Sequence, residues 1–337
     1  MERCKKLRMF MCLFMCMSFF YLFIFPSSCA SAVIVVLDGL GNLYLSPNTP
    51  YTLDGNPLPT VDVPEWMETD CSVVVRAPET STSLAVLFTG YRRATPETLS
   101  YENATIFDIF RGHGYHVYGI MEQGDNRHML NELDGAISFR GDPEEMNLVF
   151  TGEAGEWDVV GGGYDGWSIR EAIHLIDELP RPFVLVLEIA SIDMAGHRDG
   201  VEAYIQEAEQ TLNQLGELVD ICREKKIVVV ITADHGMAFK NGRGGHGGHA
   251  SIPYRFTDEA RIVPLYVSDP ASPQFQKPPN FQMYEEDVAP FILSLVGINE
   301  TPRYHEIREP VQVHWKILGV AMLFFVNMFV YALLKRK

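Results

Sequence analysis

The sequence predicts an α/β fold in which a mostly parallel central sheet carries helices on both faces. Short apolar runs alternate along the chain with segments whose apolar residues recur at helical spacing. The runs are apolar at consecutive positions, as in strands that are buried on both faces of a parallel sheet. No repeat or low-complexity stretch interrupts the alternation. Strands and helices that alternate in this way favour one α/β domain.

The first part of the chain supplies five of these elements. In order, we expect a strand at Val33–Leu37, a strand at Val73–Val75, a helix starting at Ser81–Phe88, a helix at Ile106–Arg111 and a strand at Tyr115–Ile120. Gly112 should end the second helix, because glycine commonly follows the last helical turn. Residues 121–165 are rich in glycine and acidic residues, and we expect a cap or a variable insertion there.

The second part of the chain continues the alternation. In order, we expect a helix at Ser168–Leu179, a strand at Phe183–Ile189, a helix at Val201–Glu224, strands at Ile227–Thr232 and Val263–Val267, and a helix at Asp287–Val296. The first of these helices should stop before Pro180, which cannot continue a helix. The last should stop before Gly297 for the reason given for Gly112.

The charge of the chain excludes one class of partner. The 337 residues have a net charge of −17. Eight of the 27 basic residues but only one of the 44 acidic residues lie outside 33–314, so that body has a net charge of −24. A body this acidic repels phosphate backbones, and nucleic-acid binding is therefore disfavoured.

The N-terminal 32 residues resemble a targeting segment. Residues 9–25 are nearly all apolar and follow a basic start. Ala30-Ser31-Ala32 then has the small-residue pattern of a signal-peptidase site. We expect residues 1–32 to be a signal peptide, and an uncleaved N-terminal membrane segment is the alternative.

The C-terminus resembles a membrane anchor. Residues 317–334 contain one amide, Asn327, and no charge. At 1.5 Å per residue this helix would span roughly 27 Å, enough to cross a bilayer core. Trp315 suits one interface, and the final Lys-Arg-Lys suits the cytoplasmic side. We therefore expect 315–337 to be a transmembrane anchor and 33–314 to be an extracytoplasmic or extracellular catalytic domain, with a short basic tail in the cytoplasm.

Only two cysteines, Cys71 and Cys222, lie in the body of the chain. Two cysteines cannot form a disulfide framework or a cysteine-type zinc site. Whether they pair or are simply buried is open at this point.

Carboxylates and imidazoles follow three of the expected strands. These side chains are Asp38, Asp193, His197, Asp234, His235, His246 and His249. Ligands of open α/β sheets gather beyond the carboxyl ends of the strands, so these side chains should converge there. Carboxylate with imidazole is the ligand chemistry of zinc or manganese rather than calcium. Six or seven ligands exceed one tetrahedral site and suit two adjacent metal ions, an arrangement that supports displacement at phosphorus.

Hydroxyl side chains lie at the start of one expected helix. Thr80, Ser81, Thr82 and Ser83 follow Ala77-Pro-Glu. A helix N-terminus directs backbone N–H groups at an incoming anion, and a metal ion would activate a hydroxyl there as a nucleophile. The alternative is that these residues only cap the helix.

Taken in order, these motifs resemble the alkaline phosphatase superfamily. The motifs are Val35-Val-Leu-Asp38-Gly39, Thr80 ten residues before Gly90, Asp193-Met-Ala-Gly-His197, Thr232-Ala-Asp234-His235-Gly236-Met237 and a later Gly-His pair. The chain is similar in particular to cofactor-independent phosphoglycerate mutases, nucleotide pyrophosphatase/phosphodiesterases and the ethanolamine-phosphate transferases of GPI-anchor synthesis. The resemblance runs from about residue 33 to 298 and implies an alkaline phosphatase-like fold.

The resemblance implies a role for each motif residue. Asp38, Asp234, His235 and the Thr80 hydroxyl would hold one divalent ion. Asp193, His197 and a later histidine would hold the other, with His249 preferred to His246. The ions would be Zn²⁺, with Mn²⁺ as the alternative. Thr80 would attack phosphorus to give a phospho-enzyme, which water or an acceptor hydroxyl then resolves.

This chain differs from the families that it resembles, and the differences narrow the range of activities that we expect. Sulfatases need a cysteine or serine where this chain has Thr80. Phosphoglycerate mutases are cytosolic and insert a second domain after the nucleophile, whereas the residues between Thr80 and Asp193 must here form part of the core fold. We therefore expect a membrane-anchored phosphatase, phosphodiesterase or phosphotransferase that acts on a lipid head group or glycan phosphate. The alternatives are a sulfatase-like hydrolase and a catalytically silent metal-binding surface protein.

Overall fold

A nine-stranded mixed sheet forms the centre of the fold, in a computed structural model that describes residues 30–67, 71–122, 127–139, 149–151, 163–242, 245–268 and 281–302. The strand order is β11-β2-β10-β7-β1-β6-β3-β4-β5. The strands are β1 (Ala32–Leu37), β2 (Ser72–Val74), β3 (His116–Glu122), β4 (Gly135–Phe139), β5 (Val149–Thr151), β6 (Phe183–Ile189), β7 (Val228–Thr232), β10 (Ile262–Ser268) and β11 (Gln282–Tyr284). A separate two-stranded sheet pairs β8 (Ala238–Phe239) with β9 (Gly247–Gly248).

The three central strands are buried along their whole length. β1 pairs in parallel with both β6 and β7, so that Val35 lies between Leu187 and Ile231. Every residue of the three strands is buried, which explains why their sequences are apolar at consecutive positions rather than alternating. The predicted strand at 183–189 is confirmed at both ends, and the other two differ by one residue at the start.

Antiparallel pairs occur toward the two edges of the sheet. Five of the eight pairings within the nine-stranded sheet are parallel, so this sheet is mostly parallel as predicted. β10 runs antiparallel to β7 and to β2. The chain enters β10 from the carboxyl end of β7, because Gly236 just beyond β7 donates its N–H to the oxygen of Ala260 just before β10 at 2.9 Å.

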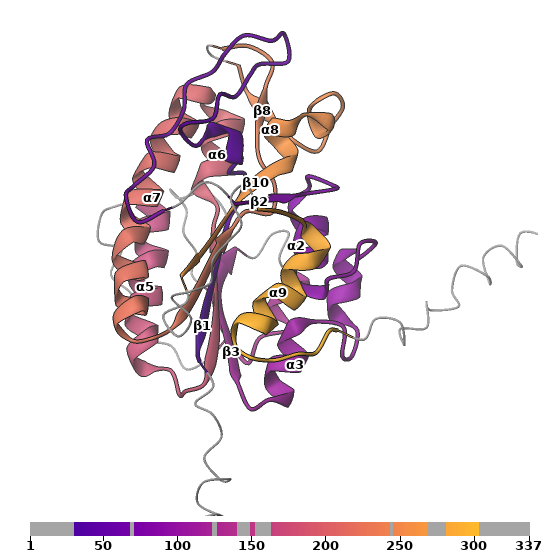
Figure 1. Ribbon diagram of the computed structural model, residues 1–337, viewed down its shortest axis with the longest axis vertical. Helices are drawn as coiled ribbons and strands as arrows, with labels where there is room; N and C mark the ends of the chain where they lie inside the picture. Colours follow the sequence, from indigo (N-terminus) through magenta and orange to yellow (C-terminus); the bar gives the residue numbers. More distant parts are fainter. Residues whose placement is uncertain are drawn as a thin grey trace, which may run out of the picture. The chain divides into compact units, whose positions relative to one another are not determined.

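Helices cover both faces of the sheet, as predicted. They are α2 (Thr80–Thr89), α3 (Ile106–Gly112), α4 (Arg127–Leu130), α5 (Gly163–Glu178), α6 (Ser191–Arg198), α7 (Val201–Glu224), α8 (Asp258–Arg261) and α9 (Val288–Leu295). Figure 1 shows α5 and α7 on one face and α2, α3 and α9 on the other. Short 3₁₀ helices are η1 (Asn42–Tyr44), η2 (Pro96–Ser100), η4 (Tyr254–Phe256) and η5 (Glu285–Asp287). The bounds of α7 coincide with the prediction, because its apolar residues face the core at a regular helical period.

The segment expected to be a cap contributes instead to the sheet. β4 pairs in parallel with β3, with Ile120 opposite Ile137, and β5 pairs antiparallel with β4. The short apolar run Gly135–Phe139 was hidden in the sequence by the glycine and acidic residues around it. The prediction of a separate cap or insertion is therefore wrong for the described part of 121–165.

The membrane predictions concern residues outside the described ranges. The apolar runs 9–25 and 317–334 lie within residues 1–29 and 303–337, outside the described residues. Among the described residues, no helix has both the length and the apolar character needed to cross a bilayer. Cys71 and Cys222 are both buried and both free thiols.

Candidate metal centre

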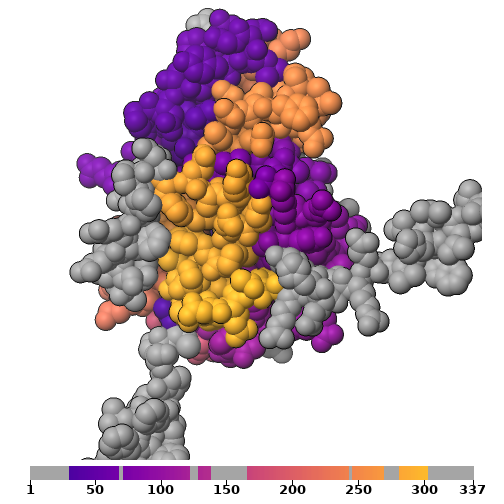
Figure 2. All heavy atoms as spheres, turned by 45° about the vertical axis from the view of Figure 1, so that its right-hand side comes forward, coloured from indigo at the N-terminus to yellow at the C-terminus, as the bar shows by residue number. Residues whose placement is uncertain are grey.

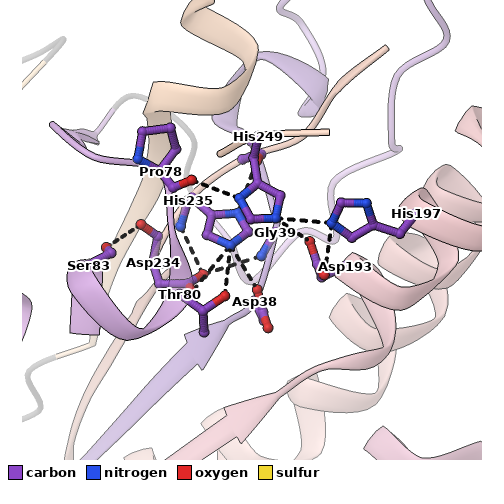
Figure 3. A network of polar contacts seen from close by, with 12 residues as sticks. Asp38, Gly39, Pro78, Thr80, Ser83, Asp193, His197, Asp234, His235 and His249 are labelled. Atoms are coloured by element: carbon purple, nitrogen blue, oxygen red, sulfur yellow. Dashed lines mark hydrogen bonds and ion pairs between the residues drawn. The ribbon is translucent and has the colours of Figure 1, made fainter. Parts of the chain in front are cut away.

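The predicted ligands converge at the carboxyl ends of β1, β6 and β7. Asp38 follows β1 directly, and Asp234 and His235 follow β7. Asp193 and His197 lie one turn apart on α6, just beyond β6, and His249 follows β9. Figure 3 shows these side chains directed toward one another. The Asp193–His197 motif was expected at a strand end, and the structure places both residues on one face of a helix.

Asp38, Asp234 and His235 form the first ligand group. One ligand atom from each lies within 4.8 Å of the others, and all three residues are buried. The His235 Nε2 atom is 3.2 Å from Asp38 Oδ1 and 3.5 Å from Asp234 Oδ2. Asp234 Oδ1 is held by the N–H groups of His235 at 2.8 Å and Gly39 at 3.3 Å, so Oδ2 is the oxygen that is left for a cation.

Asp193 and two histidines form the second ligand group. One ligand atom each of Asp193, His235 and His249 lies within 4.8 Å of the others. His197 adjoins them, with its Nε2 atom 3.0 Å from His249 Nε2 and 3.5 Å from Asp193 Oδ2. The sequence assigned His235 to one ion only, whereas in the structure it lies between the two groups, its ring stacked on that of His249 with centroids 3.7 Å apart.

The structure separates the two candidate histidines, His246 and His249, which flank β9. His249 belongs to the second ligand group, whereas His246 is exposed and lies in neither group. The His246 Nδ1 atom contacts the backbone oxygen of His197 at 2.8 Å. Geometry therefore favours His249, in agreement with the preference stated from the sequence.

Each imidazole of the centre presents Nε2 toward the site. His197, His235 and His249 direct Nδ1 at the backbone oxygens of Gly247, Gly236 and Pro78, at 3.1, 3.1 and 2.8 Å. A carbonyl oxygen can only accept, so Nδ1 carries the proton and Nε2 of a neutral ring carries a lone pair. This second contact is the usual way in which proteins orient metal-binding histidines.

The lone pairs that converge here repel one another unless a cation lies among them. The Nε2 atoms of His197 and His249 face each other at 3.0 Å. Asp193 Oδ1 and Asp234 Oδ2 are buried and accept no hydrogen bond from the described residues. Buried acceptors without donors are costly, and a divalent cation compensates for them. The residues therefore fit two divalent ions bound by nitrogen and oxygen.

Burial sets the protonation of the ligands in the absence of metal. Burial, reinforced by the Asp193 carboxylate, raises the pKa of Asp234 to about 7. Burial and the neighbouring His235 lower the pKa of His249 to about 4, and burial lowers the pKa of His235. At neutral pH both rings are therefore in the neutral form that binds metals.

Thr80 faces the first ligand group. It is the first residue of α2, and its Oγ1 atom is 3.1 Å from His235 Nε2. The helix N-cap is Glu79, so Thr80 does not occupy the capping position that was the alternative interpretation. Ser83 is buried one turn further along α2, where its hydroxyl contacts the backbone oxygen of Asp234 and the carboxyl of Glu285. Thr80 is thus the hydroxyl of this turn that lies at the ligands.

Glu285 is a buried acid of the site region that the sequence did not reveal. It is 1% exposed in η5, and burial raises its pKa to about 8. It is one of three consecutive acidic residues, and nothing in their spacing distinguishes the one that turns inward to Ser83.

Comparisons with known proteins agree with this geometry. The family model described as "Metalloenzyme superfamily" matches residues 119–271, a range that includes the ligand candidates from Asp193 to His249 but not Asp38 or Thr80. The resemblance to the alkaline phosphatase superfamily is confirmed. The chain is similar to the 2,3-bisphosphoglycerate-independent phosphoglycerate mutase of Onchocerca volvulus, with 25% identity over 171 residues, 51% of this chain and 32% of that protein. Mutase 2 of Methanosarcina barkeri is 27% identical over 202 residues, 57% of this chain and 34% of that protein.

Solved structures of the superfamily share the fold. A putative sulfatase, yidJ from Bacteroides fragilis, superposes with a TM-score of 0.57 at 15% identity and covers 84% of this chain and 76% of its own. The lipoteichoic acid synthase LtaP from Listeria monocytogenes has a TM-score of 0.51 at 14% identity, over 81% of this chain and 73% of its own. These superpositions show that the chain has the alkaline phosphatase-like fold. The chain spans about a third of the length of the mutases that it matches.

Proposed function

We propose that this chain is a two-metal phosphohydrolase or phosphotransferase that acts through a Thr80 phospho-enzyme. The observation that carries the proposal is the position of the Thr80 hydroxyl, 3.1 Å from His235 Nε2 and beside two groups of carboxylate and imidazole ligands. Asp38, Asp234 and His235 would hold one ion, and Asp193, His197 and His249 the other. When bound, two divalent ions would lower the pKa of the Thr80 hydroxyl and stabilise negative charge on the phosphoryl oxygens. We expect Zn²⁺ in preference to Mn²⁺.

The residues of the chain divide the reaction between them. The Thr80 hydroxyl gives up its proton to solvent and Oγ1 forms a bond to phosphorus, while the bond from phosphorus to the ester oxygen breaks and the leaving oxygen takes up a proton. The N–H groups of the first turn of α2 point at the phosphoryl oxygens. In the second step the oxygen of water or of an acceptor alcohol bonds to phosphorus and Thr80 is released. Ser83 and Glu285 hold α2 against the Asp234 segment, which keeps Thr80 in place for both steps.

Hydrolysis of model esters tests this proposal. Full-length protein in detergent, supplied with Zn²⁺ or Mn²⁺, should release p-nitrophenol from a mono- or diester, and the ratio of the two rates separates phosphatase from phosphodiesterase. Thr80→Ala should lower turnover at least about 10³-fold, because the nucleophile is lost. Thr82→Ala is the matched control, since this hydroxyl lies on the same turn but contacts Glu79 at 3.0 Å. Equal turnover by Thr80→Ala and Thr82→Ala would refute the nucleophile assignment.

The same assay separates the alternative functions. A sulfatase-like hydrolase would release p-nitrophenol from the sulfate ester and not from the phosphate esters. A catalytically silent metal-binding protein would bind two metal ions and hydrolyse none of the esters. Thr80 favours phosphate transfer, because a sulfatase requires a cysteine or serine at this position.

We propose a substrate at the membrane surface, a lipid head group or glycan phosphate. The predicted span at 317–334 would keep the protein at the bilayer, with its catalytic domain outside the cytoplasm. In the segment that follows His249, Ile252 is 75% exposed and Phe256, in η4, is 66% exposed, which suits a substrate with an apolar part. Figure 2 shows the orange part of the chain that includes this segment at the surface beside the indigo N-terminal part of the fold. A lipid-linked phosphate ester should be turned over faster than its water-soluble analogue, and a preference for the soluble ester would contradict the proposal.

We further propose that the N-terminal segment stays attached. Ser31 is buried, and its side chain accepts the N–H of Phe183 at 3.1 Å, while Ala32 opens β1 between β6 and β7. Cleavage after Ala32 would remove these contacts from the centre of the sheet. N-terminal sequencing of the membrane-bound protein should find a start before Ala30, and a start at Val33 would contradict this.

A further inference from the structure

Two buried tyrosines lie directly behind the first ligand group. Tyr44 comes from η1 and Tyr204 from α7, and neither has any exposed surface. Their rings meet edge to face with centroids 4.9 Å apart, and both pack against Phe239 of β8, at 6.2 and 5.5 Å. The three rings form one rigid aromatic cluster, because edge-to-face packing leaves little freedom of orientation in a close-packed interior.

The Tyr204 hydroxyl binds the loop that follows Asp38. It donates to the backbone oxygen of Gly39 at 2.8 Å and accepts the N–H of Gly41 at 3.0 Å. One oxygen thus fixes both ends of a three-residue turn that begins immediately after a ligand. The position of the Asp38 carboxylate depends on this turn, because Asp38 is the last residue before it.

The Tyr44 hydroxyl binds the loop that carries His235. It donates to the backbone oxygen of Met237, two residues after His235, at 2.8 Å. The ring contact between Tyr44 and Tyr204 therefore links two loops that are about 200 residues apart in the sequence. Both loops supply ligands to the same predicted ion.

We propose that Tyr44 and Tyr204 are positioning residues that set the distance between the Asp38 and His235 loops and so preorganise the first metal site. The proposal rests on the metal centre of the proposed function. Water cannot replace hydroxyls that have no exposed surface, so loss of either one releases its loop from the aromatic cluster. Groups that hydrogen-bond metal ligands directly contribute about 10- to 100-fold to metal affinity, and we expect an effect of this order from hydroxyls that hold the ligand-bearing loops.

Phenylalanine substitutions test the proposal, because they remove the hydroxyl and keep the ring. Zn²⁺ affinity of the full-length protein is measured with a competing chelator, without substrate, for Tyr44→Phe and Tyr204→Phe. Each should weaken binding of at least one of the two ions about 10- to 100-fold, and His235 belongs to both ligand groups, so binding of the second ion should also weaken.

Tyr115→Phe is the matched control. Tyr115 is also buried, and its hydroxyl donates to the backbone oxygen of Ala30 at 3.1 Å, just before the amino end of β1 and away from the ligands. Tyr115→Phe removes a partly buried hydrogen bond to a backbone oxygen and Tyr44→Phe removes a buried one, so the urea midpoints of both metal-free variants should fall. Only Tyr44→Phe should also lose Zn²⁺ affinity.

The outcomes separate a positioning role from a structural one. Wild-type Zn²⁺ affinity in both tyrosine variants, with midpoints lowered as in Tyr115→Phe, would overturn the proposal. Should Tyr204→Phe fail to fold, Tyr44→Phe decides alone, since it removes a single bond. Absence of ester turnover by the wild type would refute the proposed function but would leave the measured dependence of metal affinity on the two hydroxyls unaffected.

Discussion

Replacement of Gly39 by alanine should both destabilise the fold and disturb the second ligand group. Gly39 follows the ligand Asp38 and has φ +82°, in the left-handed region. A Cβ atom added there would lie 2.9 Å from the Cβ atom and 3.0 Å from the Cα atom of Asp193. Because one of these atoms belongs to the backbone of α6, rotation of a side chain cannot relieve the contact, and the helix that carries Asp193 and His197 must shift.

The loss of unfolding free energy in Gly39→Ala has two contributions, and a control variant separates them. A left-handed backbone costs an L-residue about 1–2 kcal/mol. Overpacking of a rigid neighbour adds about 1–3 kcal/mol, so Gly39→Ala should lose about 2–5 kcal/mol of unfolding free energy. Gly55 has a similar φ of +80°, and a Cβ atom there would meet no atom within 4 Å. Gly55→Ala should therefore lose only about 1–2 kcal/mol, the cost of a left-handed backbone.

Urea unfolding of the metal-free variants and Zn²⁺ titration measure the two effects. Gly39→Ala should lose more stability than Gly55→Ala, and it should bind the ion of the Asp193 group more weakly, whereas Gly55→Ala should bind both ions as the wild type does. Equal losses of stability in the two variants, with wild-type Zn²⁺ binding in both, would refute the reasoning that Gly39 is required by its contact with Asp193.

Three further predictions concern the ligands and a nearby buried acid. His249→Ala should weaken Zn²⁺ binding at least about tenfold while His246→Ala changes it less than threefold, because the structure directs only His249 at the other ligands; calorimetric titration of both variants checks this. The Asp234 pKa of about 7 means that a cation must displace a proton below that pH, so Zn²⁺ affinity should fall by up to about tenfold per unit as pH drops from 7 to 6, measured in a competing chelator. Burial raises the pKa of Asp165 to about 6, although Ser191 and Thr211 donate hydrogen bonds to it. The folded state therefore holds this proton more tightly than the unfolded chain does, and the stability that it contributes is complete below about pH 4 and lost as pH rises through 6. Asp165→Asn should remove roughly 3 kcal/mol of this pH dependence, and urea unfolding between pH 4 and 7 that matched the wild type would contradict the assignment.

Local patterns were sufficient for most elements of the fold. The runs at 33–37, 183–189 and 227–232 had to be central strands, because consecutive apolar residues are stable only where both faces of a strand are buried. β4 was missed because its apolar run is short and its neighbours resemble a loop. The antiparallel direction of β10 depends on the end of the sheet from which the chain enters the strand. The hydrophobic periodicity of the segment does not indicate this direction.

The sequence alone determined the residue types of the centre and the place of Asp38, Asp234 and His235 at strand ends, because ligand chemistry and strand periodicity are both local properties. It could state a preference for His249 over His246 but could not decide between them by position. Tertiary structure alone placed His235 between the two ligand groups, turned Glu285 inward to Ser83, and brought Tyr44 and Tyr204 behind the Asp38 and His235 loops. The contacts of Glu285, Tyr44 and Tyr204 join residues 163 to 202 positions apart. Their geometry follows from how the helices and loops pack on the sheet, which the periodicity of any one segment does not encode.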